Sequence, residues 1–384
     1  MASITLESIP TELWKDIATL ACTDGGYTGR SLALTSKFVH TQSWPWRLHS
    51  VALTSLQDLE NLLVFLRTAE RQPSIEHLYL SFANESTIKP PPDLWTTYWC
   101  LSEEERETYN DKSGRAKQAW DARFAPAITE MLALAGPTLR TLCIIEERPV
   151  RLPSFTHGVF PKLEELTLHG YILPIFPVDQ VKAALSKSRP PAQPLISELS
   201  ARLPALQRLH LVHTSGRRLS SSDAVNCIAY LAPPNLTHLR LSDVHRGAIL
   251  SWEVMVGGAD LDEIDAWESM PMKLPRISQV IAHGCRAAPG GESGIPDSGW
   301  DDFCNDLEAF ARRCERVWAI SVLHMMRPWR RDRRWKERLR KDWMGRIEGR
   351  DGCWVQSEEE EAAREAEVCE DGLPTQLPEV DDDL

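Results

Sequence analysis

One phrase of apolar and polar positions recurs six times along the chain. It consists of a proline, any residue, a leucine or isoleucine, two residues, a leucine or valine, one residue and a mostly apolar residue. The copies occupy residues 73–80, 137–144, 161–168, 204–211, 234–241 and 275–282. Each copy ends in an alternation that, in a β-strand, directs apolar side chains to one face and polar ones to the other. The pattern therefore predicts six half-buried strands.

The segments between the copies have the period of an α-helix. Apolar residues three and four positions apart predict helices within residues 127–135, 222–232 and 300–310. A strand, a helix and a second strand in the same direction form a parallel unit with a right-handed crossover. The chain is thus predicted to be an α/β protein in which parallel strands and helices alternate and stack.

This body resembles a leucine-rich-repeat protein. The L-x-x-L-x-L core of that family stands, with isoleucine variants, at residues 75–80, 139–144, 163–168, 206–211 and 236–241. Successive copies are 64, 24, 43, 30 and 41 residues apart, whereas regular leucine-rich repeats recur every roughly 20–29 residues. The resemblance implies an irregular solenoid with long insertions over residues 51–326. The alternative is that the copies are ordinary strands of one α/β domain.

In a solenoid, the polar positions of the strands line one exposed face and are candidate contacts for a bound protein. Those positions and their immediate neighbours are Glu76, His77, Tyr79, Glu164, Glu165, Thr167, Gln207, Arg208, His210, Thr237, His238 and Arg240.

The first fifty residues follow a different pattern. Pro10 opens an amphipathic helix that carries Leu13, Ile17 and Leu20 on one stripe. A second helix is predicted over residues 31–40. A Trp-Pro-Trp sequence then breaks this helix, and an extended segment follows.

The sequences of these segments resemble those of the F-box-like proteins abundant in mushroom-forming fungi. IPTELWKDI stands at residues 9–17, SLALTSKFVH at 31–40 and RLHSVAL at 47–53. The resemblance implies a trihelical F-box-like module over residues 1–50, and leucine-rich repeats are the usual companions of that module.

In that family, the F-box helices bind the small Skp adaptor of cullin-type ubiquitin ligases, and the repeats hold a protein substrate. The resemblance implies that this chain is a substrate receptor with a Skp adaptor and a cullin scaffold as partners. The implied adaptor contacts are Ile9, Pro10, Leu13, Ile17, Leu32, Leu34 and Val39. A module of this size has too little core of its own, which leaves apolar side chains to share with a partner.

A second hypothesis is a repeat scaffold that binds a protein without any ligase, in which the N-terminal helices are only a cap. The two hypotheses differ at Leu13 and Ile17. A receptor exposes these side chains in the free protein, whereas a cap buries them.

The C-terminal part of the chain consists of a basic segment followed by an acidic one. Of the 384 residues, 55 are acidic and 43 basic, and this net charge of −12 argues against a generally basic nucleic-acid binder. Residues 327–350 nevertheless hold eleven basic and four acidic side chains around an apolar, tryptophan-containing stripe, which predicts a basic helix. Residues 351–384 hold thirteen acidic side chains and one basic one, and we expect this tail to be disordered.

Two interpretations of the basic helix are open. Its stripe covers the end of the last repeat while its charges stay in water or pair with the acidic tail. Alternatively, arginine and tryptophan together bind RNA, acidic lipid or an acidic protein segment, and this helix is then the one candidate for nucleic-acid binding.

Common catalytic motifs are absent from the sequence. It contains no phosphate-binding loop, dinucleotide fingerprint, nucleophile elbow or H-E-x-x-H. We therefore expect no enzyme, no catalytic or metal-binding residues and no cofactor. The nine cysteines are scattered, and neither a signal peptide nor an apolar run of membrane-spanning length is found. These features predict a soluble protein of the cytoplasm or nucleus with no membrane partner.

Overall fold

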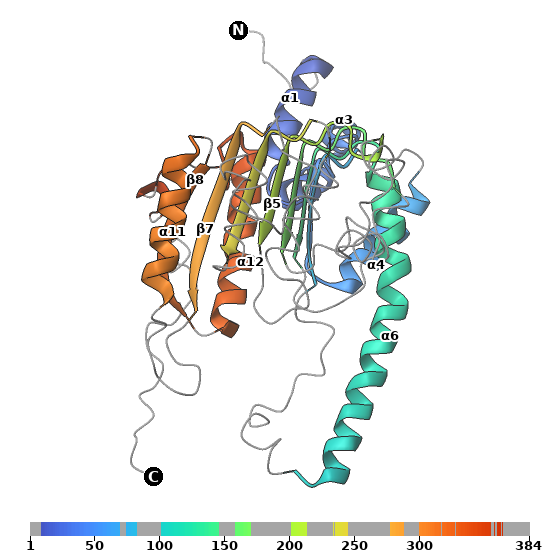
Figure 1. Ribbon diagram of the computed structural model, residues 1–384. Coiled ribbons are helices and arrows are strands. Elements are labelled where there is room, and N and C mark those ends of the chain that lie inside the picture. Colours follow the sequence, from blue (N-terminus) through green and yellow to red (C-terminus); the bar gives the residue numbers. More distant parts are fainter. Residues whose placement is uncertain are drawn as a thin grey trace, which may run out of the picture.

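The computed structural model describes the repeated body and the segments that flank it (Figure 1). The described residues are 9–69, 74–82, 101–145, 158–169, 201–212, 233, 235–244, 277–287, 299–315, 317–326, 328–354, 357, 359–361 and 363. The helix predicted over residues 222–232 lies outside them.

Within this part of the chain, eight parallel strands form one sheet whose spatial order follows the chain order. They are β1 (Ser50–Leu53), β2 (His77–Ser81), β3 (Thr141–Ile145), β4 (Glu165–His169), β5 (Arg208–Val212), β6 (His238–Val244), β7 (Gln279–Ala287) and β8 (Val317–Met326). Each recurrent phrase supplies one of the strands β2 to β7. The predicted α/β arrangement of parallel strands in chain order is confirmed, and it is compatible with a solenoid.

The register aligns the six copies position by position. One row across the sheet consists of Leu78, Leu142, Leu166, Leu209, Leu239 and Val280. All six side chains are buried in one core, together with the leucine or isoleucine three residues earlier in each copy. We call this side of the sheet the leucine face.

Helices between the strands cover the leucine face. They include α4 (Leu56–Thr68), α6 (Glu103–Ala135) and α11 (Gly299–Arg313). The side chain of Ser102 starts α6 by accepting the Glu105 amide, and the Glu105 carboxylate accepts the Ser102 amide in return. Buried residues of α6 begin at Trp120, so the helix predicted over 127–135 is only its packed end, and the rest runs beyond the strands (Figure 1).

The N-terminal segment forms three short helices, α1 (Thr11–Ala21), α2 (Tyr27–Thr35) and α3 (Lys37–Ser43). The prediction of one helix over residues 31–40 is wrong because Ser36 interrupts it. Its backbone is extended, with φ −159° and ψ 162°, and its hydroxyl accepts the Val39 amide as the cap of α3.

The C-terminal helix α12 (Pro328–Ile347) confirms the helix predicted in the basic segment, but the interpretation that places it at the end of the last repeat is wrong. It lies against the sheet (Figure 1), where its Trp335, Leu339 and Trp343 pack on Tyr79 and Cys143. The physical reason is that several supposedly polar strand positions are apolar, so the second face of the sheet also needs a cover. No described helix has the length and apolarity that crossing a bilayer requires.

Candidate functional site

The second face of the sheet, opposite the leucine face, was the predicted contact surface. Helix α12 and the segment after it cover much of this face. Adjacent strands bring Tyr79, Thr167, His210 and Arg240 into one row across this face. All four are buried, as is Glu165, so the prediction that they contact a partner is wrong. Helix α12 and the segment after it take the place that a partner would occupy.

Other predicted contacts remain accessible because they lie just before a strand or at its first position. The half-buried or exposed ones are Glu76, His77, Glu164, Gln207, Arg208, Thr237 and His238. The edge of the sheet where the strands begin, which we call the start edge, is therefore the open part of the predicted surface.

A groove of about 380 Å³ lies at the start edge. Its lining consists of Ser74, Glu76, Thr138, Arg140, Pro161, Lys162, Glu164 and Ala205. Arg140 Nη2 donates to Glu164 Oε1 at 2.8 Å, and Arg140 Nη1 lies 3.9 Å from Glu76 Oε2. Charges of both signs thus alternate along the groove.

A buried charge network fastens the C-terminal segment to the second face. The Glu361 carboxylate accepts from Arg240 of β6 at 2.6 Å and also from Arg338 of α12, and Glu361 is 0% exposed. Arg338 Nε lies 3.5 Å from Asp342 Oδ2, and Arg240 also donates to the Cys353 carbonyl. Two cations and two anions therefore balance, as burial of charge requires.

The network corrects the prediction that the chain is disordered from residue 351 onward. Cys353 and Trp354 are buried against Ile281 of β7, and Glu361 is enclosed by arginines. A single carboxylate in an acidic run is enough to anchor that run when two buried cations face it. The remainder of the predicted tail, residues 364–384, lies outside the described residues.

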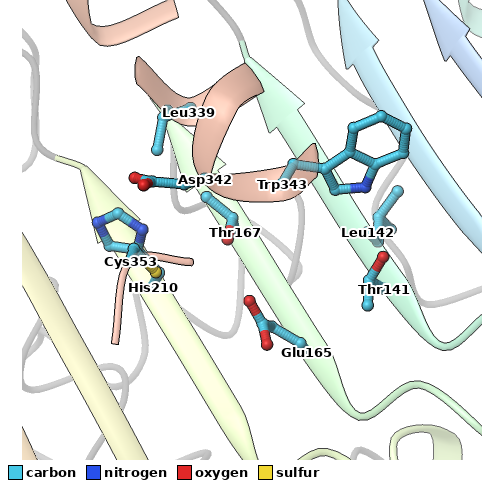
Figure 2. A pocket seen from close by; sticks show the side chains of 9 residues that line it. All are labelled: Thr141, Leu142, Glu165, Thr167, His210, Leu339, Asp342, Trp343 and Cys353. Atoms are coloured by element: carbon cyan, nitrogen blue, oxygen red, sulfur yellow. The ribbon is translucent and has the colours of Figure 1, made fainter. Parts of the chain in front are cut away.

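Beneath α12 there is a cavity of about 10 Å³ (Figure 2). Figure 2 shows Asp342 and Trp343 of α12 above the strands that carry Glu165, Thr167 and His210. A space of this size holds about one water molecule, so it is no ligand pocket.

Cys353, which lines this cavity, and the buried Cys143 are poor nucleophiles. Burial raises the pKa of both the Cys143 and Cys353 thiols well above the ordinary value, and the nearby Asp342 carboxylate raises them further. Both thiols are therefore protonated at neutral pH, and thiolate chemistry is disfavoured.

The N-terminal helices expose an apolar surface. In α1, Trp14 and Ala18 are buried, and the Trp14 ring meets Phe38 of α3 edge to face at 5.9 Å. The opposite stripe is in solvent, with Leu13 52%, Ile17 45% and Leu20 77% exposed. Helix α1 thus has two apolar stripes, and the described part of the chain packs on one of them.

The other residues predicted to contact an adaptor lie at different depths. Leu34 is 87% exposed and Pro10 is exposed, whereas Ile9 and Leu32 are half-buried. Val39 is 3% exposed and packs inside the helices, so its side chain is covered in the free chain. The predicted set omitted Leu20, although its spacing from Leu13 and Ile17 already placed it on the same stripe.

Neither a family model, nor a curated protein, nor a solved structure matches the chain.

Proposed function

We propose that the chain is a substrate receptor of a cullin-type ubiquitin ligase that binds a Skp adaptor through α1 and α2. The observation that supports this proposal best is the exposure of Leu13 and Ile17 on a helix that packs through its opposite stripe. Large apolar side chains grouped on one exposed helix face mark an interaction surface. A helix serving only as an N-terminal cap would bury that stripe.

The position of α1 also supports the proposal. The helix projects beyond the edge of the sheet (Figure 1), where a partner can approach without displacing a strand. An amphipathic helix that offers residues at i, i+4 and i+7 is a common mode of helix recognition by a partner groove.

A protein substrate is then held by the repeated body. Because α12 covers the second face, the groove at the start edge is the surface proposed for this contact. Its alternating charges, with Glu76, Arg140, Lys162 and Glu164, suit a polar peptide of mixed charge. The chain itself performs no chemistry in this proposal and contributes proximity to the ubiquitin carrier, in the cytoplasm or nucleus.

Co-purification with a Skp adaptor tests the proposal. The intact chain is expected to form a stoichiometric complex in size-exclusion chromatography. The double substitution Leu13→Asp, Ile17→Asp is expected to weaken the complex at least about 100-fold, because it removes buried apolar area and places two charges in the interface.

The matched control is Val64→Asp, an equally exposed apolar side chain at 56% on α4. It should leave the complex unchanged, and circular dichroism should show that all variants are folded. A complex that survives the double substitution, or no complex with the intact chain, contradicts the proposal and favours the repeat scaffold without a ligase.

A further inference from the structure

Two histidines and a glutamate meet where the first two strands begin. His49 directly precedes β1, Glu76 directly precedes β2, and His77 is the first residue of β2. The amides of Glu76 and His77 both donate to the His49 carbonyl at 3.0 Å. The main chain therefore holds the three residues together whatever their side chains do.

Their ligand atoms converge. One nitrogen of each histidine and a carboxylate oxygen of Glu76 all lie within 4.8 Å of one another. His49 Nδ1 is 3.9 Å from Glu76 Oε1, and the two imidazole rings meet edge to face with centroids 4.9 Å apart. Small side-chain rotations bring these atoms to the spacing of ligands around one ion.

The His49 ring nitrogen indicates that a ligand is needed. His49 is 5% exposed, and its Nδ1 has no hydrogen-bond partner. A buried polar atom without a partner costs free energy, and a metal ion satisfies a ring nitrogen as well as a hydrogen bond does.

Neighbouring groups orient the other two side chains. His77 Nδ1 lies 2.9 Å from the Thr141 hydroxyl, which fixes the ring and leaves its second nitrogen for a ligand. Glu76 Oε2 faces Arg140 at 3.9 Å, while Glu76 Oε1 faces His49. Metal-binding imidazoles and carboxylates are commonly held by outer hydrogen bonds and charges of this kind.

The protonation states also suit a metal. Burial lowers the pKa of His77 to about 3, with further lowering by His49, Arg140 and Arg346. Burial lowers the pKa of His49 as well. Both rings are therefore neutral at pH 7, the form that binds a cation.

We propose that His49, Glu76 and His77 bind a divalent transition-metal ion, with zinc as the preferred ion. Two imidazoles and one carboxylate form a zinc donor set that leaves a fourth position for water or for a group of a partner. Glu76 also lines the start-edge groove, so the ion lies beside that groove. None of its three residues is among those proposed to bind the adaptor.

Metal titration of the intact, metal-stripped chain under reducing conditions tests the inference. Calorimetry with Zn²⁺ is expected to show one equivalent bound. Bound Co²⁺ should give weak visible bands without the intense near-ultraviolet absorption of thiolate ligands, which separates this site from the cysteines. His77→Gln is expected to weaken Zn²⁺ binding more than about 100-fold, and Thr141→Val, which removes only the orienting hydroxyl, by about 10–100-fold.

The matched control is His238→Gln, because His238 begins β6 at the same row of the register as His77. It should bind Zn²⁺ like the intact chain. Three outcomes overturn the inference: no binding by the intact chain, equal affinity in a folded His77→Gln variant, or thiolate absorption with Co²⁺. If His77→Gln does not fold, unchanged affinity in Thr141→Val overturns it.

Discussion

Replacing Glu361 by alanine is expected to destabilise the folded chain by about 3–5 kcal/mol, the cost of leaving buried charges without their partner. The Glu361 carboxylate forms ion pairs with both Arg240 and Arg338, and all three side chains are buried. Water cannot compensate either guanidinium at this depth. Chemical denaturation followed by tryptophan fluorescence measures the loss.

The control for this prediction is Glu360→Ala, at the exposed neighbouring position. We expect it to change the free energy of unfolding by less than about 0.5 kcal/mol. Hydrogen exchange should also show reduced protection of α12 in Glu361→Ala alone, because Arg338 lies on that helix. A loss below about 1 kcal/mol, or equal effects of both variants, would contradict the view that Glu361 anchors the C-terminal segment.

The sheet was largely predictable because its signal is local. In each copy, the apolar residues on one side of a strand are two residues apart, and the register stacks them into two neighbouring rows. Strand β8 lacks the Pro-x-Leu opening and reads VWAISVLHMM, an apolar run without alternation, so the phrase did not reveal it. The first half of α6 was missed because it has no apolar stripe.

The cover of the second face could not be predicted, because it depends on segments far apart in the sequence. The aromatic stripe of α12 was evident, but its partner Tyr79 is more than 250 residues earlier. An apolar stripe predicts that a helix packs against something, but not which surface it packs on. Cys143, an apolar residue at the alternate position where the phrase predicts a polar side chain, was the available signal.

The two candidate sites also differ in whether their signal is local in the sequence or depends on distant segments. The stripe of Leu13 and Ile17 is local, and its spacing alone predicts a helix face that the structure leaves exposed. His49 and His77 belong to no short motif, and only the pairing of β1 with β2 brings them together. Sequence reasoning therefore expected no metal-binding residues there.

Replacing Gly29 by alanine is expected to disrupt the N-terminal helices. Gly29 is buried in α2, and a Cβ added there would collide with the Arg47 carbonyl oxygen, so α2 must move away from the turn before β1. Backbone cannot yield as a flexible side chain does, and we expect a loss of about 3 kcal/mol or more, at the upper end of overpacking costs.

The matched substitution is Gly114→Ala in α6, where an added Cβ meets no atom within 4 Å. In an exposed helical position this change should stabilise by about 0.5–1 kcal/mol. The melting temperature measured by circular dichroism should therefore fall for Gly29→Ala and rise for Gly114→Ala. Gly29→Ala retains Leu13, Ile17 and Leu34. If it loses the adaptor complex while Gly114→Ala keeps it, binding depends on the relative position of α1 and α2. An unchanged melting temperature in Gly29→Ala would contradict the close approach of α2 to Arg47.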